Sequence, residues 1–331
     1  MGTLPGANVS SSTIYESNDK TIVVLDIPWS LEESQRLDAG QDVLRRRLYS
    51  AEPVAVPFTT PEPRDGGGAH LAQSQAAQLA DLMTTATVQA ALDHLSAQYA
   101  GPYCHPRLVP EDSLAVPDGY YEPQGSTHLH GSIQDMRQTF LDTAPDFQLI
   151  VLDPPWPNRS VRRSKKYRTA SKTSDIKELL SLIPVPAKLA PDGLVAIWVT
   201  NAASVRDLVT SSTGLLASWG MELVTEWTWV KVTSLGEPLY DVNSRWRKPW
   251  EKLLIAKRAG ARLPKVPTSK VIIAVPDLHS RKPNLRELFK DVLGDGYTGL
   301  EVFARNVTAG WWCWGDETLM FQEKRHWAVI D

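Results

Sequence analysis

Short apolar segments alternate with helical stretches over the C-terminal two thirds of the chain, and this alternation limits the possible folds most strongly. Short, continuously apolar runs are typical of strands that a sheet buries on both faces. Alternation of such strands with helices predicts a doubly wound α/β sheet. The predicted strands are Gln148–Leu152, Leu194–Thr200, Leu223–Val230, Leu253–Ala256, Val271–Val275 and Gly299–Phe303, and the predicted helices are Ser174–Ile183, Ala202–Trp219 and Asn284–Leu293.

The first part of the chain has a different pattern. Thr21–Asp26 predicts a strand, and a helix over residues 30–50 is expected after it, with Ser30 as N-cap and Glu33 completing a capping box. A Pro- and Gly-rich stretch follows, and a long helix rich in Ala, Leu and Gln is expected from Leu71. We therefore expect an N-terminal helical or mixed region over residues 1–125 and the α/β domain over residues 126–331.

Composition limits the partners and the compartment. The 331 residues carry a net charge of -3, so nucleic-acid binding would need a local basic patch. Two cysteines cannot form a disulfide framework and favour a reducing compartment. No apolar run approaches the roughly 18–20 residues of a membrane span, so no membrane partner is expected. All but one of the 12 tryptophans lie at or beyond Trp156.

The segment Asp153-Pro154-Pro155-Trp156 follows the first predicted strand of the α/β domain. Ligands of doubly wound sheets bind at the carboxyl ends of strands, where Asp153 is placed. The prolines fix a stiff turn that can present the Asp153 carboxylate and the Pro154 carbonyl together. Two neighbouring acceptors suit an amino group with two hydrogens, and Trp156 adds a flat face. This pattern favours a site for an aromatic amine such as adenine.

An adenine amine is a poor nucleophile because its lone pair is delocalised into the ring. Two acceptors on its hydrogens would favour a tetrahedral nitrogen that can attack a positively charged methyl donor in line. A lone Asp-Pro-Pro triplet is more often a turn after a buried strand. The tryptophan, the apolar strand before it and the basic loop after it favour the catalytic interpretation.

The segment "DPPWPNRSVRRSKKY" resembles the MT-A70 family of adenine methyltransferases, in particular the branch of methyltransferase-like protein four. The similarity continues in family order over roughly residues 125–325. Further segments that carry it are "GLVAIWVTN", "WGMELVTEWTWVKVT", "WRKPWEKLLIAK", "SRKPNLRELF" and "LEVFARNVTAGWWCWGDE". The resemblance implies a class I S-adenosylmethionine-dependent methyltransferase fold, Rossmann-like with a permuted motif order, and S-adenosyl-L-methionine as the cofactor.

The resemblance also implies roles for particular residues. Asp153 and Pro154 would hold the target amine, and Pro155 and Trp156 would shape the base pocket. Among the expected cofactor contacts, Lys282 would reach the methionine carboxylate. The other expected cofactor residues are Arg305 and Asn306 at the ribose, Asp316 and Glu317 near the ribose or tail, Asp153, and Ile133 at the adenine. The Ile133 assignment leaves Ser132-Ile133 and Asp135-Met136 open, because the family's Asp-Ile pair is not present in "GSIQDM". Asp316 likewise departs from the family's usual Asn.

Two basic stretches are candidates for nucleic-acid contacts. The first contains Arg159, Arg162, Arg163, Lys165 and Lys166, and the second contains Arg245, Trp246 and Arg247. A solvated loop or a nuclear import signal is the alternative for the first stretch, and a packed loop is the alternative for the second. Cys104, His105, His128 and His130 lack a second close cysteine or carboxylate pattern, so no metal is expected.

The expected function is methylation of the 6-amino group of adenine in RNA, with 2'-O-methyladenosine of small nuclear RNA as one candidate substrate. Methylation of DNA adenine and a catalytically silent nucleic-acid-binding scaffold are the alternatives. We expect a nuclear protein, with the cytoplasm also open. The helical N-terminal region would let the chain act as a monomer, and a family-type heterodimer is the other possibility.

Overall fold

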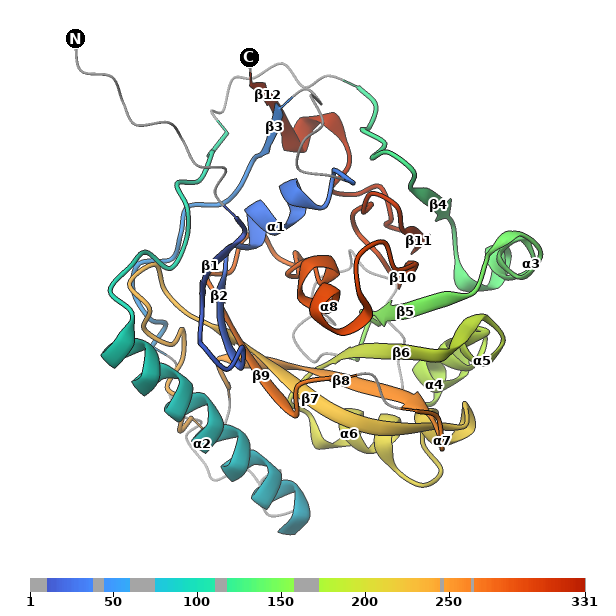
Figure 1. Ribbon diagram of the computed structural model, residues 1–331, viewed down its shortest axis with the longest axis horizontal. Coiled ribbons are helices and arrows are strands. Elements are labelled where there is room, and N and C mark those ends of the chain that lie inside the picture. Colours follow the sequence, from blue (N-terminus) through green and yellow to red (C-terminus); the bar gives the residue numbers. More distant parts are fainter. Residues whose placement is uncertain are drawn as a thin grey trace.

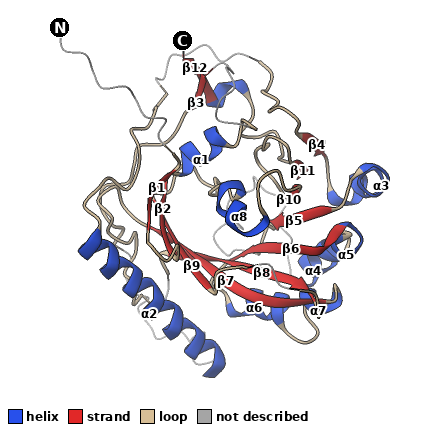
Figure 2. Cartoon of the chain, in the orientation of Figure 1, coloured by secondary structure: helices blue, strands red, loops and turns tan. Residues whose placement is uncertain are grey.

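The computed structural model describes residues 11–37, 45–59, 75–110, 118–157, 173–244, 247–262 and 265–330. Within these ranges a large twisted sheet runs through the molecule, with helices on both of its faces (Figures 1 and 2). In spatial order its strands are β1 (Thr13–Glu16), β2 (Ile22–Leu25), β9 (Ser269–Ala274), β7 (Met221–Lys231), β8 (Trp250–Arg258), β6 (Leu189–Val199), β5 (Phe147–Leu152), β10 (Gly299–Val302), β11 (Trp312–Gly315) and β4 (Thr127–His130).

Strand direction decides which loops meet at the functional edge. Adjacent strands from β2 to β4 pair in parallel, except that β8 pairs antiparallel with both β6 and β7. The carboxyl ends of β5, β6, β7, β9, β10 and β11 therefore share one edge with the beginning of β8. The sheet thereby brings together side chains that are far apart in the sequence.

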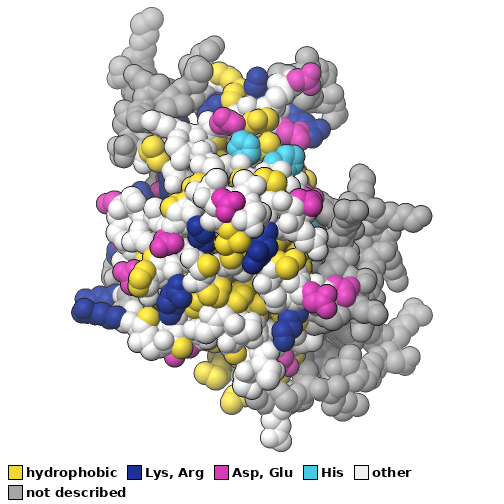
Figure 3. All heavy atoms as spheres, turned by 90° about the vertical axis from the view of Figure 1, so that its right-hand side faces the viewer, with side chains coloured by type: hydrophobic (Ala, Val, Ile, Leu, Met, Phe, Trp, Pro, Cys, Tyr) yellow, Lys and Arg dark blue, Asp and Glu magenta, His cyan; other side chains and the backbone are white. Residues whose placement is uncertain are grey.

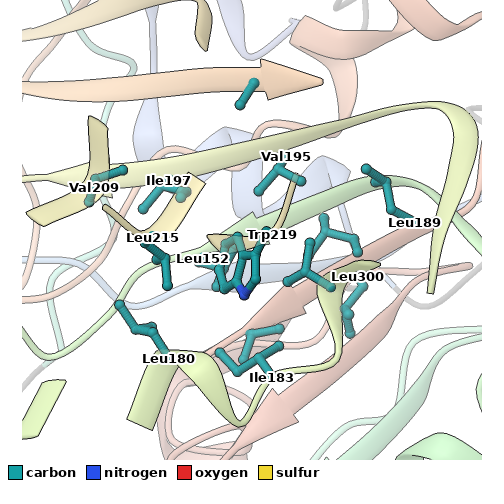
Figure 4. Close-up of a cluster of buried hydrophobic side chains, with 14 of the residues drawn as sticks. Leu152, Leu180, Ile183, Leu189, Val195, Ile197, Val209, Leu215, Trp219 and Leu300 are labelled. Carbon is teal, nitrogen blue, oxygen red and sulfur yellow. The ribbon is translucent and has the colours of Figure 1, made fainter. Parts of the chain in front are cut away.

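One face of the sheet is covered by α3 (Ile133–Thr143), α4 (Thr173–Ser181), α5 (Val185–Lys188), α6 (Ala203–Thr210) and α7 (Leu215–Ser218). The core of this face contains Leu152, Ile197 and Trp219, packed as Figure 4 shows. Full burial of such side chains stabilises the fold by about 1.5–3 kcal/mol each. The opposite face is covered by α1 (Ile27–Glu33) and α8 (Arg286–Leu293), and its core contains Trp198, Trp227 and Phe289.

A third core joins the N-terminal part of the chain to the sheet. Val88, Ala91 and Leu95 of α2 (Gln75–Gln98) are buried in one cluster with residues of β2, β7 and β9. The strands β1 and β2 belong to the main sheet, because β2 pairs with β9. The region before residue 125 therefore shares the sheet and the core of the α/β domain.

The helix expected from Ser30 was wrong in both its start and its extent. Helix α1 begins earlier because Asp26 is its N-cap, with the Asp26 carboxylate accepting from the Trp29 amide at 2.8 Å. It ends at Glu33, and Arg45–Leu48 forms β3, which pairs antiparallel with β12 (Trp327–Ile330). Pairing with a strand almost 300 residues away outweighs the local helical preference.

The single helix expected over Ala202–Trp219 is also wrong, because it is two short helices. Helix α6 ends before Ser211, whose backbone is extended with φ -64° and ψ 162°. Gly214 then passes so close to the preceding turn that an added Cβ would lie 2.9 Å from the Leu208 carbonyl oxygen. The polar Ser-Ser-Thr-Gly turn therefore separates α6 from α7.

Candidate active site

Asp153 lies directly after the last residue of β5, at the carboxyl edge of the sheet. Its amide donates to the Val302 carbonyl oxygen at 3.3 Å, which ties the turn to the end of β10. The Pro154 carbonyl accepts from the Trp156 amide at 2.8 Å. A carbonyl oxygen has two lone pairs, so Pro154 keeps one acceptor position for another donor. The sequence therefore builds the stiff acidic turn that its two prolines predicted.

An alternating chain of charges crosses the edge beside this turn. Lys282 Nζ lies 2.8 Å from Asp153 Oδ1 and 3.2 Å from Glu251 Oε2. On the other side, Arg305 Nη1 lies 3.1 Å from Asp153 Oδ2. Two further contacts extend the chain of charges, Lys231 Nζ to Glu251 Oε1 at 2.5 Å and Arg305 Nε to Glu317 Oε2 at 2.8 Å. We call the six residues Lys231, Glu251, Lys282, Asp153, Arg305 and Glu317 the edge network.

Burial and charge act in opposite directions within this network. Burial raises the pKa of Glu251, but Lys282 and Lys231 outweigh it and lower that pKa to about 2. Burial lowers the pKa of Lys282, but Asp153 and Glu251 outweigh it and raise that pKa above its ordinary value. Both groups are therefore charged at neutral pH, and each stabilises the charged form of the other.

Trp156 anchors the turn to the protein core. Its ring is 7% exposed and packs in the core of the α3–α7 face. Its indole Nε1 donates to the Trp198 carbonyl oxygen at 2.7 Å, near the end of β6. This hydrogen bond fixes the orientation of the Asp-Pro-Pro segment relative to the next strand, a function that the sequence did not predict.

A small polar cavity lies beside the edge network on the sheet face that carries α8. Its lining includes Lys282, Asn284, Glu301 and Asn306, together with Trp198 and Trp311. The Asn306 Nδ2 atom is buried and has no hydrogen-bond partner within the part of the chain that the structure describes. Burial first, and then the charge of Asp153, raise the pKa of Glu301 to about 7. The cavity therefore offers a donor without a partner beside a carboxyl group that titrates near neutrality.

The remaining predicted cofactor residues have different positions. Ile133 is 3% exposed and packs with Leu129 and Phe140 at the start of α3, so its side chain is part of the core. Asp316 is exposed, and its backbone oxygen lies 2.9 Å from His130 Nε2. The structure thus brings Asp153, Lys282, Arg305 and Glu317 into direct contact, places Asn306 at the neighbouring cavity, and leaves Ile133 and Asp316 outside this network.

Sequence reasoning missed Lys231, Glu251 and Glu301. Glu301 is an acidic residue inside an otherwise apolar strand, opposite Val151 of β5, and that exception was a usable signal. Glu251 and Lys231 carried no such signal, since both lie at strand ends where charged residues are common. Only the antiparallel pairing of β8 with β7 places Glu251 next to Lys231.

Most of the predicted nucleic-acid contacts lie outside the described residues. These are Arg159, Arg162, Arg163, Lys165, Lys166, Arg245 and Trp246. Arg247 is described and exposed, and its guanidinium lies 5.7 Å from the centre of the Tyr240 ring. The face that carries α3 and β4 mixes Lys and Arg with Asp and Glu side chains (Figure 3).

Two kinds of feature are absent from the described residues. No three His, Cys, Asp or Glu side chains in these ranges gather into a metal-binding group. None of the described helices combines the length and apolar character needed to cross a bilayer.

The residues around the cavity fit S-adenosyl-L-methionine. The donor set combines the Lys282 cation with the unpartnered Asn306 amide, which suits a ligand with a carboxylate and hydroxyl groups. Glu251 and Asp153 supply negative charge that suits a sulfonium cation. Lys282 and Asn306 line this cavity, and Arg305 and Glu317 lie in the edge network beside it.

The sheet with its one reversed inner strand, and the charged site at its carboxyl edge, define a class I S-adenosylmethionine-dependent methyltransferase. Residues 147–317 match the model of the MT-A70 family, and the chain belongs to that family. It is 50% identical to "N6-methyladenosine RNA methyltransferase MTA1" of Cryphonectria parasitica over 96% of this chain and 94% of that protein. The protein of the same name from Pyricularia oryzae is 42% identical, over 98% of each chain. The mouse "N(6)-adenine-specific methyltransferase METTL4" is 36% identical over 64% of this chain and 46% of its own length.

Proposed function

We propose that this protein transfers a methyl group from S-adenosyl-L-methionine to the 6-amino group of adenine in RNA. The observation that carries the proposal is the Asp153 carboxylate, held at the end of β5 by Lys282 and Arg305. The names of the relatives that match nearly the whole chain support RNA as the substrate. DNA is the second candidate, because a relative from Caenorhabditis elegans, 31% identical over 62% of this chain, is named "DNA N6-methyl methyltransferase".

The cofactor, when bound, supplies an electrophilic methyl group. Asp153 accepts a hydrogen bond from the adenine amine, and the second lone pair of the Pro154 carbonyl accepts the other hydrogen. These contacts would hold the nitrogen and localise its lone pair, which would form the new carbon–nitrogen bond as the carbon–sulfur bond of the donor breaks. The methylated nitrogen is acidic and would lose one proton through its hydrogen bond to Asp153 and then to water. Asp153 keeps its Lys282 and Arg305 contacts during this step, because a carboxylate has about four acceptor positions for its donors. The fixed charges then need no reorganisation as charge moves in the transition state.

The test is methyl transfer to adenine-containing RNA by the purified full chain and by Asp153→Asn. The substitution preserves shape but replaces one acceptor oxygen by a donor. We expect turnover to fall about 10²–10³-fold. Cofactor binding, measured by calorimetry, should weaken far less if Lys282 and Asn306 carry most of it. Turnover by Asp153→Asn at the wild-type rate would refute the role of the carboxylate, and wild-type protein that binds RNA without turnover would be a scaffold.

The finer features of the substrate need separate comparisons. We propose 2'-O-methyladenosine of small nuclear RNA as a substrate and the nucleus as the place of action. RNA pairs that differ only in the 2'-O-methyl group would test the first, and fractionation of cells with and without the gene would test the second. Sedimentation of the active protein would distinguish a monomer from a heterodimer.

A further inference from the structure

A second surface with unpaired positive charge lies beside the site, on the small sheet formed by β3 and β12. We define the β3–β12 surface by Arg46, Lys324, Arg325, Tyr120 and Tyr121. Arg46 lies opposite Val329 in the pairing of the two strands. The Tyr120–Glu323 bridge and the hydrogen bond from the Tyr121 amide to the Gln322 carbonyl hold the two tyrosines against the segment before β12.

Two of these cations have no carboxylate partner among the described residues. The Arg46 guanidinium lies 4.0 Å from the centre of the Tyr121 ring, and Lys324 Nζ lies 5.8 Å from the centre of the same ring. Contacts of this kind orient a cation without neutralising it. Of the nearby acids, Glu323 pairs with Arg325 and Glu122 lies 3.9 Å from His128. Arg46 and Lys324 therefore keep their charge available for an anionic ligand.

His326 lies between this surface and the protein interior, and its pKa reflects both burial and neighbouring cations. Burial, followed by the charges of Arg281 and Arg325, lowers the pKa of His326 to about 4. Arg281 is 3% exposed and pairs with the buried side chain of Asp277, whose Oδ2 lies 2.6 Å from Arg281 Nη1. The shift therefore comes first from burial, and the unpaired charge of the β3–β12 surface rests on Arg46 and Lys324 among the described residues.

Buried contacts connect this surface to the edge network. Arg281, which precedes Lys282, donates from Nη1 to the Tyr49 carbonyl at the end of β3 at 2.7 Å. Its guanidinium also lies 4.5 Å from the centre of the Phe321 ring, and the Phe321 amide donates to the Arg305 carbonyl at 2.8 Å. The buried Arg281 and Phe321 therefore tie the segments that carry Arg46 and Lys324 to the segments that carry Lys282 and Arg305.

We infer that the β3–β12 surface is a second nucleic-acid contact, which binds the strand on one side of the target adenine. Arg46 and Lys324 would contact phosphates. Tyr120, whose side chain is 43% exposed, would stack against a base. A single strand fits better than an acidic peptide, because the exposed ring of Tyr120 near Arg46 and Lys324 suits bases joined by phosphates. The inference assumes the proposed RNA substrate but concerns a different surface.

The test compares the wild-type full chain with Arg46→Glu/Lys324→Glu, using fluorescent single-stranded RNA of about 25 and about 6 nucleotides. Each RNA carries one adenine. The long RNA is made in two versions, one with the adenine near the 5' end and one with the adenine near the 3' end. We expect the double variant to bind the long RNA about tenfold more weakly, with a salt slope smaller by about 1.4 because two cations are lost. Binding of the short RNA and its turnover at saturation should stay unchanged.

Two controls isolate the charge. Lys20→Glu/Lys265→Glu makes the same charge change at the opposite edge of the sheet, before the beginnings of β2 and β9, and should bind like wild type. Arg46→Lys/Lys324→Arg keeps both charges and should also bind like wild type. A circular dichroism melt of each variant checks that the chain is folded.

Three outcomes would overturn the inference. The first is an unchanged affinity of the double variant for the long RNA. The second is an equal loss of affinity for the short RNA. The third is tighter binding of a labelled polyglutamate peptide than of RNA at this surface. Absence of methyl transfer to any RNA by wild-type protein would refute the proposed function instead. In that case a selective loss of long-RNA binding by the double variant would still support this surface.

Discussion

Lys282 Nζ lies 2.8 Å from Asp153 Oδ1 and joins the predicted catalytic carboxylate to Glu251, 3.2 Å away. The lysine follows β9, the aspartate follows β5, and the glutamate lies at the beginning of β8. One cation therefore balances two carboxylates from different strands. This sharing explains how three charges remain at a site where their side chains are only 10–23% exposed.

Replacing Lys282 by Met should destabilise the folded protein. It should also make the free energy of unfolding depend less on pH in the acid range. The folded-state pKa of Glu251 is about 2, below its ordinary value of 4.5. Glu251 thus contributes stability above pH 4.5 that is lost as the pH falls toward 2. Without Lys282 we expect a loss of about 1–3 kcal/mol at pH 7 and a flatter decline in acid.

Urea unfolding at pH 7 and pH 3 measures both effects of the Lys282 substitution. Lys290→Met, which breaks a more exposed pair with Glu287, should cost less than about 1 kcal/mol. Equal losses for the two variants would contradict the shared role of Lys282.

Trp156→Phe should lower both stability and turnover. The change keeps an aromatic ring but removes the 2.7 Å hydrogen bond to Trp198, which leaves a buried carbonyl unpaired and costs about 1–3 kcal/mol. Trp327→Phe removes a comparable buried hydrogen bond of 2.8 Å to Phe321. Thermal melts should show similar losses for both variants, while kcat should fall only for Trp156→Phe. Equal kcat values would argue against the anchoring role of Trp156.

Glu301→Gln should stabilise the protein at alkaline pH. The folded-state pKa of Glu301 is about 7, above its ordinary value of 4.5. The folded protein therefore binds more protons than the unfolded chain between these values, and stability falls as the pH rises from 4.5 to 7. We expect the neutral variant to gain about 2 kcal/mol at pH 8 and little at pH 4. An equal gain in stability at both pH values would show that removal of the Glu301 charge is not its cause.

The basic loop after the Asp-Pro-Pro-Trp motif lies outside the described residues, so its role stays a prediction from the sequence. Charge reversal at Arg162 and Arg163 should weaken RNA binding strongly at low salt and less at high salt, because phosphate contacts release counterions. Anisotropy titrations at several salt concentrations measure the slope. An unchanged affinity would favour the alternatives, a solvated loop or a nuclear import signal.

The sequence by itself determined the α/β architecture, the six predicted strands of the α/β domain and the turn at Asp153. These features depend on local patterns, namely short apolar runs and two consecutive prolines that restrict their own backbone. It also pointed to Lys282, Arg305 and Glu317, through their order in segments that resemble a known family. In the structure Lys282 and Arg305 contact Asp153, and Glu317 contacts Arg305.

Only the tertiary structure decided how Glu251, Lys231 and Glu301 join the site, that Trp156 is an anchor, and that Arg45–Leu48 is a strand. Each of these depends on a partner from a distant segment: β7 beside β8, the Trp198 carbonyl, and β12 beside β3. Local propensity differs between alternatives by less than about 1 kcal/mol per residue, so pairing and burial with distant partners outweigh it. A side chain's neighbours across a sheet depend on strand order and direction, which no local stretch of sequence contains.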